Sequence, residues 1–509
     1  MSIVPTLLEQ LENPHLDRQQ RAELSCQVAR VLEDVGDYQG ARETLREFWR
    51  RVGDKPRTAG LDRSAAAELL LRTGTLTGWI GHFRQLNGAQ ELAKNLITES
   101  IRTFESLSYT QKILEGQIEL AYCYWREGGQ DEARDILKSV ISQLTTDSEL
   151  KAKALLRSAI VESSTNRYYD ALRILQDYAP LFEKINNETI KGGYCNELGL
   201  VFKNLAASAK REDYLDRAFV EYTAASIHFE QAGHTSYLAL VENNLGYLFF
   251  KAGRFDEAHE HLNRSRQLLS NLKDKGTVAQ VDETRARVFL AENRNSEAEE
   301  VARAAVLALE SGGRQSLLVE ALVSHGTALS RLGLYDHARL TLYRAMEVAD
   351  QSGALIDAGL AALALLEELR EHMTQDEIQA VYARAYESLS ASQDEDTLRR
   401  MLLASTCLTS QGREHAPQQL ETKGTLRQAM RSYEGMIIKH ALQNAGGAVT
   451  KAARMLGVSH QALTYLLNYR HRYLLAERTP IIKRRRSIAK RRQPRDLPGS
   501  TSLKVTNDK

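Results

Sequence analysis

Five polar side chains cluster near the C-terminal end of the sequence. They carry hydroxyl, imidazole and amide groups: Ser459, His460, Gln461, Thr464 and Tyr465. Such groups both donate and accept hydrogen bonds, which is the chemistry that reads the edges of nucleic-acid bases. Because they are neutral or weakly basic, we expect them to discriminate between bases while adding little to the attraction for a polyanion.

Two short helices would position these side chains. The first should bury Ala452, Ala453 and Leu456, which fall at helical spacing. Gly457 then ends this helix in a left-handed conformation, because glycine has no Cβ. Ser459 can cap the second helix, and we expect three of its residues to face the first helix: Ala462, Leu463 and Leu466. Two short helices around a turn with glycine predict a helix-turn-helix.

A longer pattern surrounds this motif. It consists of Glu434, Ile437, Ala441, Leu442, Gly446, Gly447, Thr450, Ala452, Ala453, Leu456, Gly457, Val458 and Leu463. With this pattern, residues 432–467 resemble the Fis-type helix-turn-helix found at the C-termini of bacterial nitrogen-regulator-like activators. The resemblance implies binding of double-stranded DNA. Ala448 departs from it, because the family usually has a helix-capping Asn there. The alternative is an ordinary helical hairpin of a larger α-domain.

The charge is distributed unevenly along the chain. Residues 425–509 hold 18 Lys and Arg against 4 Asp and Glu, and residues 1–424 hold 49 against 62. A small basic segment beside a large acidic one is typical of a nucleic-acid-binding appendage. We expect DNA backbone contacts from these residues: Thr450, Lys451, Arg454, Arg470, Arg472, Lys483, Arg484, Arg485 and Arg486. The alternative for the basic tail is a solubilising disordered end or a localisation signal.

An internal repeat dominates the chain up to about residue 354. Its clearest unit runs from Asn244 to Ala258 and contains a Leu245-Gly246 pair followed by Gly253-x-aromatic-x-x-Ala. This unit resembles the tetratricopeptide repeat, which implies a helical hairpin whose second helix crosses the first at the Ala. Counterparts of this Ala occur at Ala41, Ala93, Ala133, Ala171, Ala218, Ala258, Ala298 and Ala338.

The predicted fold class is all-α: a tetratricopeptide-like helical solenoid of about eight hairpins, followed by a small helix-turn-helix domain. Pro180 is the one proline between Arg57 and Ala416, so one helix can follow another with few proline breaks. The expected divisions are a solenoid at 1–354, a helical cap at 355–408, a linker at 409–424, the helix-turn-helix domain at 425–478 and a basic, largely disordered tail at 479–509.

The repeat resemblance also implies a groove lined by the first helices of the hairpins. Eight residues map to that face: Tyr122, Trp125, Arg126, Asn196, Lys203, Asn243, Tyr247 and Arg287. Asn196 and Asn243 both stand two residues before a Leu-Gly pair, so their amides could hydrogen-bond the backbone of a peptide or protein ligand. The alternative is that these two side chains hold one first helix against its neighbour.

The sequence lacks the signatures of catalysis. It has no GxxxxGK[ST] phosphate loop and no GxGxxG that opens a helix. His259 and His261 are two residues apart and would point to different faces of one helix, which is poor metal geometry. No run of 18 apolar residues occurs, and the four cysteines are far apart: Cys26, Cys123, Cys195 and Cys407. We expect a cytoplasmic protein without enzyme activity, cofactor, metal or membrane span.

Together these features predict a bacterial transcriptional regulator that binds DNA as a homodimer and senses or docks a partner through its solenoid. An apolar stripe before the helix-turn-helix could pair across a two-fold axis, and its members are Leu426, Met430, Tyr433 and Ile437. The alternative function is a protein–protein scaffold whose C-terminal domain dimerises or binds nucleic acid without sequence preference.

Overall fold

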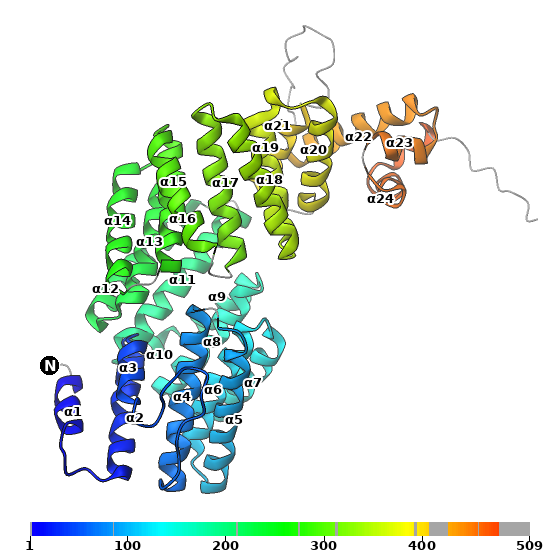
Figure 1. Cartoon of the computed structure of the whole chain (residues 1–509). Helices are drawn as coiled ribbons and strands as arrows, with labels where there is room; N and C mark the ends of the chain where they lie inside the picture. Colours follow the sequence, from blue (N-terminus) through cyan, green and yellow to red (C-terminus); the bar gives the residue numbers. More distant parts are fainter. Residues whose placement is uncertain are drawn as a thin grey trace, which may run out of the picture. The chain divides into compact units, whose positions relative to one another are not determined.

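A computed structural model describes residues 3–84, 86–209, 212–272, 275–310, 314–390, 394–406, 426–456 and 458–477. Among these residues there are helices, turns and short connections and no β-strand, which confirms the all-α prediction. The chain divides into two compact units, one up to Ala416 and one from Pro417 (Figure 1). The expected linker at 409–424 and tail at 479–509 lie outside the described residues.

The first unit is a series of antiparallel helical hairpins (Figure 1). Its first helices are α2 (Arg18–Asp34), α4 (Arg63–Phe83), α6 (Thr110–Arg126), α8 (Glu149–Ser164), α11 (Glu188–Ala209), α13 (Thr235–Lys251), α15 (Lys275–Ala291) and α17 (Gln315–Arg331). Their partners are α3 (Tyr38–Thr44), α5 (Ala89–Leu107), α7 (Gln130–Gln143), α9 (Tyr168–Asp177), α12 (Glu212–Ala232), α14 (Phe255–Leu272), α16 (Asn295–Leu309) and α18 (Tyr335–Gln351). The predicted tetratricopeptide-like solenoid is therefore confirmed. Two short helices lie outside these pairs, namely α1 (Ile3–Leu11) and α10 (Ala179–Lys184).

The repeat signature acts through close approach of the two helices in a hairpin. All eight predicted alanines lie on the second helices and have 0% of their surface exposed. A Cβ on Gly246 would lie 2.6 Å from Leu262 Cγ, and one on Gly326 would lie 2.6 Å from Leu342 Cγ. These glycines therefore let the first helix touch the second. Gly253 follows α13 with a φ of 72°, the left-handed region that favours glycine.

The segment expected as a cap continues the hairpin packing. Helix α19 (Leu355–Leu369) is followed by a short 3₁₀ turn (Arg370–His372), α20 (Gln375–Leu389) and α21 (Glu395–Thr406). A Cβ on Gly359 would lie 2.6 Å from Leu389 Cγ, so α19 approaches α20 as the earlier first helices approach their partners. Gly359 thus plays the part that Gly246 plays in the repeat, although the sequence after residue 354 lacks the Gly-aromatic turn of the repeat.

The first hairpin also touches hairpins that follow much later in the chain. The hydroxyl of Thr189, at the start of α11, donates a hydrogen bond of 2.7 Å to the backbone carbonyl of Asp34. Gly36, in the turn between α2 and α3, faces the imidazole of His234, and a Cβ there would lie 2.2 Å from the ring. These contacts close the helices from α2 to α13 around a common interior, which the sequence pattern did not predict.

The second unit is a small bundle. It contains α22 (Leu426–Asn444), α23 (Val449–Met455), α24 (His460–Tyr465), a π-helical turn (Leu466–Arg470) and a 3₁₀ turn (Arg472–Glu477). Its core consists of Ile438, Ala441, Leu442, Ala445, Val449, Ala452, Ala453, Leu463, Leu467 and Leu474. Small alanines stand where α22, α23 and α24 meet, as the helix-turn-helix prediction requires.

Three details of the predicted motif can be compared with the structure. The Ser459 hydroxyl accepts a hydrogen bond of 3.0 Å from the Ala462 backbone and caps α24, as predicted. Ala448 starts α23 without a side-chain cap. The prediction for Ala462 was wrong, because its side chain is exposed. The buried positions are Leu463 and Leu467, four residues apart on one helical face, and Leu466 is partly buried against the same core. Gly457 lies outside the described residues.

Candidate nucleic-acid interface and ligand groove

The polar residues of α24 present an accessible face. The side chains of Ser459, His460 and Gln461 are exposed, and Tyr465 is 62% exposed. Thr464 is half-buried, and its hydroxyl donates a hydrogen bond of 2.7 Å to the His460 carbonyl. Four of the five predicted readout residues are therefore open to a ligand, and Thr464 is engaged within its own helix.

The predicted phosphate-binding residues fall into four groups. Thr450, Lys451 and Arg454 are exposed on α23. Arg472 is exposed, and its Nε donates a hydrogen bond of 2.7 Å to the Asn468 carbonyl. Arg470 instead forms an ion pair with Glu434, with 3.3 Å between Nε and Oε2. The cluster Lys483, Arg484, Arg485 and Arg486 lies outside the described residues.

A buried polar contact that the sequence pattern missed holds the end of this unit. His471 is fully buried, and its Nε2 lies 2.6 Å from Glu434 Oε2 on α22. Arg431 of the same helix donates a hydrogen bond of 2.7 Å to the Arg470 carbonyl. These contacts tie the turn after α24 to α22. Glu434 belongs to the Fis-type pattern, and its two partners follow the segment where that pattern stops.

A cavity of about 280 Å³ lies inside the first unit, lined by residues of α2, α3, α4, α6, α8, α11, α12 and α13 and of the connections beside them. Aromatic rings form much of its wall. The Trp79 ring centre lies 5.0 Å from that of Tyr38 and 5.3 Å from that of Tyr122. Of the predicted groove residues, Tyr122 and Asn196 line this cavity. The two residues come from hairpins that are adjacent in space to α8.

Two guanidinium groups lie against these rings. The Cζ atom of Arg126 is 4.0 Å from the centre of the Trp79 ring and 4.2 Å from that of Tyr122. The Cζ atom of Arg157 is 3.6 Å from the centre of the Tyr122 ring. Cations over aromatic faces are attracted by the ring quadrupole. We therefore call Trp79, Tyr122, Arg126 and Arg157 the cavity cluster.

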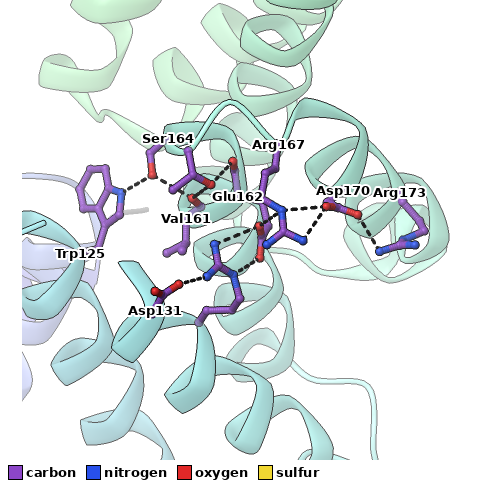
Figure 2. Close-up of polar contacts among 10 residues, drawn as sticks. Trp125, Asp131, Val161, Glu162, Ser164, Arg167, Asp170 and Arg173 are labelled. Carbon is purple, nitrogen blue, oxygen red and sulfur yellow. Dashed lines mark hydrogen bonds and ion pairs between the residues drawn. The ribbon is translucent and has the colours of Figure 1, made fainter. Parts of the chain in front are cut away.

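Trp125 is held at the edge of the cavity cluster. Its ring stacks on Tyr122 with 4.7 Å between centres. Its indole N–H donates a hydrogen bond of 3.0 Å to the Ser164 hydroxyl, which itself donates to the Val161 carbonyl (Figure 2). The polar edge of the indole is therefore satisfied within the solenoid. Figure 2 also shows Glu162 and its ion pair with Arg167, and the Glu162 carboxylate accepts a further hydrogen bond from Arg134.

A second group of cations surrounds Tyr247 on α13. The Nζ atoms of Lys203 and Lys251 lie 5.5 Å and 5.8 Å from the Tyr247 ring centre. The Cζ atom of Arg287 lies 5.5 Å from the same centre, and its Nη1 is 3.8 Å from Glu283. Burial lowers the pKa of Lys203. The structure thus brings three predicted groove residues together. We call Lys203, Tyr247, Lys251 and Arg287 the Tyr247 cluster.

The two predicted asparagines have different surroundings. Asn196 faces the cavity and accepts a hydrogen bond of 3.4 Å from the amide of Asn244 on the next first helix. Asn243 is 8% exposed, and its Oδ1 has no hydrogen-bond partner among the described residues. Asn196 therefore lies where a ligand could reach it, and Asn243 is buried within the solenoid wall.

Several cavity residues escaped the sequence analysis. Trp79 and Arg157 each stand fourteen residues before a helix-crossing alanine, namely Ala93 and Ala171, as Asn244 stands before Ala258. Aligning the hairpins on their alanines would therefore have placed both on the groove face. His234 and Tyr237, whose rings stack with 4.0 Å between centres, had no such signal, because they lie at the start of α13, where His234 meets the first hairpin.

The predicted absence of a metal site can be examined in the described part of the chain. Within it, no three His, Cys, Asp or Glu side chains are grouped to hold a metal ion. His259 and His261 contact different carboxylates, Glu292 and Glu242, at 2.7 Å each. Burial raises the pKa values of the Cys123 and Cys195 thiols to about 12. No helix in the described residues is long and apolar enough to cross a membrane.

Comparison with known proteins gives a family match for the C-terminal segment. Residues 429–468 match the family described as bacterial regulatory protein, Fis family. No curated protein sequence matches the chain.

Three solved structures are similar to this chain, and each is less than 15% identical to it in sequence. The Rap protein complexed with competence and sporulation factor has 14% identity and a TM-score of 0.48, with coverage of 69% of this chain and 91% of that chain. The apo form of the quorum sensor NprR from B. thuringiensis has 12% identity and a TM-score of 0.41, with coverage of 66% and 98%. A signal transduction ATPase with a tetratricopeptide repeat sensor from Pyrococcus horikoshii has 13% identity and a TM-score of 0.47, with coverage of 78% and 68%.

Proposed function

We propose that this chain is a sequence-specific DNA-binding transcriptional regulator whose solenoid binds a peptide or protein partner. One observation carries the proposal: residues 429–468 match a Fis-family helix-turn-helix, and its second helix presents exposed Ser459, His460 and Gln461. Exposed Lys451 and Arg454 stand on the preceding helix. A helix that offers amide and hydroxyl groups beside cations suits base contact flanked by phosphate contact.

The proposed complex with DNA has two copies of the chain. In a dimeric helix-turn-helix protein, two recognition helices enter successive major grooves about 34 Å apart. Helix α22 is the proposed pairing element, since it carries the predicted apolar stripe. Ile437 of that stripe is half-buried within one copy. The side chains of Leu426, Met430 and Tyr433 lie outside the described residues.

The solenoid is the proposed sensing or docking element, and we assign it no catalysis. Its cavity of about 280 Å³ is lined by aromatic rings, the Arg157 guanidinium and the Asn196 amide, and Arg126 lies against two of those rings. A pocket with apolar walls and a few directed polar groups is typical of ligand sites. A regulator of DNA that senses a small partner would work in the bacterial cytoplasm, where both are present.

The rival function is a scaffold whose C-terminal unit dimerises or binds nucleic acid without sequence preference. The neutral chemistry of α24 favours it, because no Lys or Arg stands between His460 and Tyr465. Selection of bound sequences from random duplex DNA by the full-length protein separates the two functions. We expect a two-fold symmetric motif with half-sites about one helical turn apart. Recovery of unenriched sequences would refute sequence-specific regulation and leave the scaffold.

A further inference from the structure

The cavity cluster and the Tyr247 cluster belong to one face of the first helices. On α11, Asn196 lines the cavity and Lys203 follows seven residues later, two turns along the same side. On α13, Tyr237 lines the cavity, and Asn244 and Tyr247 recur at helical spacing after it. Because Asn244 contacts Asn196, the face continues from the cavity to Tyr247.

Most of the cations on this face lack a carboxylate partner. In the parts of the chain that the structure describes, no carboxylate lies within ion-pair distance of Arg126, Arg157, Lys203 or Lys251, and each is held against an aromatic ring. Arg126 Nη2 is buried without a hydrogen-bond partner. A buried guanidinium N–H left unpaired is unfavourable, so an acceptor that reaches it would be bound strongly.

This face is rich in cations, although residues 1–424 as a whole have a net negative charge. Residues 1–424 hold 49 basic against 62 acidic residues. The cavity cluster and the Tyr247 cluster nevertheless place two groups of cations on the first helices of the hairpins. Neighbouring carboxylates have other partners, since Glu119 pairs with Lys153 at 2.6 Å and Glu197 accepts from Ser163. Burial also raises the pKa of Glu197 to about 7, which reduces its negative charge near neutrality.

We propose that the groove binds an acidic linear peptide, whose carboxylates meet the cavity cluster and the Tyr247 cluster. This inference rests on the proposed function of the groove in binding a peptide or protein. A guanidinium stacked on a ring keeps its N–H edge directed outward, and that edge matches a carboxylate in bidentate geometry. The amides of Asn196 and Asn244 lie between the clusters, where a peptide backbone would pass. The chain's own basic tail has the wrong sign for this groove.

A peptide fits this face better than a single-stranded nucleic acid, although both are attracted to cations beside aromatic rings. The cavity lining includes the carboxylates of Asp34, Glu119 and Glu197. A nucleic acid carries a phosphate at every nucleotide and would bring negative charge beside them. The acidic side chains of a peptide are separated by neutral backbone, whose N–H groups can donate to such carboxylates.

Fluorescence anisotropy of the full-length protein tests the proposal. The probes are fluorescein-labelled pools of short random peptides enriched in Asp and Glu, matched pools with Asn and Gln, matched pools with Lys and Arg, and a labelled oligothymidine. The variants are Arg157→Gln, Lys203→Gln and Lys251→Gln, with circular dichroism as a check of folding. The control is Arg173→Gln on α9, which removes one cation whose side chain is 69% exposed and paired only with Asp170.

We expect the acidic pool to bind most tightly and to weaken as salt is added. Each groove variant should weaken the acidic pool by about tenfold or more and leave the Asn and Gln pool unchanged, because a hydrogen bond to a charged group contributes about 1.5–3 kcal/mol. Should Arg157→Gln fail to fold, Lys203→Gln and the exposed Lys251→Gln give the same comparison. Equal binding of all peptide pools, or preference for the basic pool or for oligothymidine, would refute the acidic peptide. Binding of no peptide pool would refute the proposed function of the groove itself.

Discussion

Thr189 donates its hydroxyl to the backbone carbonyl of Asp34 at 2.7 Å, across 155 residues of sequence. The contact joins the start of α11 to the end of α2, so hairpins at the two ends of the first five enclose the cavity between them. Gly36 and His234 meet beside it. The aromatic wall of the cavity depends on this closure, because Tyr38 and Trp79 come from the first two hairpins, and the Arg157 guanidinium lines the same cavity.

Gly36→Ala should disrupt the contact between Gly36 and His234. The substitution places a methyl group 2.2 Å from the His234 ring and forces Ala to a φ of 75°. Gly253→Ala is the matched control, since Gly253 has a φ of 72° with nothing within 4 Å. Both variants should lose about 1–2 kcal/mol of unfolding free energy from the left-handed backbone, and Gly36→Ala should lose more. Urea denaturation compares them, and equal losses would show that the contact with His234 does not hold the first hairpin.

Glu197→Gln should change how stability depends on pH. Glu197 is 5% exposed, and burial raises its pKa from 4.5 to about 7, opposed by the hydrogen bond from Ser163. The folded chain then keeps a proton that the unfolded chain releases above pH 4.5. The resulting stability is complete below pH 4.5 and is lost as the pH rises through about 7.

Unfolding free energies at about pH 5 and about pH 8 measure this loss. Glu197→Gln keeps an acceptor for Ser163 without an ionisable group, so its loss between the two pH values should be smaller than in the native chain. Glu260→Gln on α14, an exposed position, is the control and should leave the pH dependence unchanged. An unaltered pH dependence in Glu197→Gln would show that this carboxyl is ionised in the folded state.

Asn196→Ala and Asn243→Ala should differ in their effect on peptide binding. Asn196 lines the cavity, so its loss should weaken peptide binding while the fold stays intact. Asn243 is buried with an unpaired Oδ1, so its loss should leave peptide binding unchanged. Anisotropy with the tightest peptide pool measures binding, and thermal unfolding measures stability. If only Asn243→Ala weakened binding, the assignment of Asn196 to the ligand face would be wrong.

Glu434→Gln should loosen the second unit. Glu434 contacts fully buried His471 at 2.6 Å and also pairs with Arg470. Removing the charged partner of a buried hydrogen bond costs about 1.5–3 kcal/mol. Faster hydrogen exchange at 426–477 in the full-length protein should follow. Arg470→Gln is the comparison, because its ion pair is 40% exposed at the arginine and should contribute under about 1 kcal/mol. Equal protection in Glu434→Gln and the native chain would refute this assignment.

The sequence pattern predicted the packing contacts that recur at fixed spacing within each hairpin. It missed the contacts between distant hairpins, which depend on the path of the whole solenoid. The eight buried alanines and Gly246 were identified because each acts within one hairpin. The contact of Thr189 with Asp34 was not, since it depends on the rotation accumulated over several hairpins. Ala462 was assigned to the core because it lies at helical spacing from Leu466, whereas the fully buried pair at the same spacing is Leu463 and Leu467, one position further along the chain.

The last prediction separates the attraction for DNA from the reading of its sequence. Helix α24 offers exposed but neutral groups, so most phosphate contacts should come from other residues. Lys451 and Arg454 are exposed on α23, whereas Arg470 is already paired with Glu434. Each neutralised phosphate contributes about 0.9 to the slope of log affinity against log salt. Lys451→Gln should therefore lower that slope by about 0.9, and Arg470→Gln should lower it less.

Truncation after Glu477 should remove the basic tail, weaken binding to all duplexes alike and flatten the salt dependence further. Gln461→Ala should instead weaken the preferred duplex by about 1–3 kcal/mol, if its amide meets an adenine edge, with an unchanged slope. Electrophoretic mobility shifts over a range of salt, with the selected duplex and a scrambled one, measure both quantities. Loss of sequence preference on truncation, together with native behaviour of Gln461→Ala and His460→Ala, would show that α24 does not read the bases.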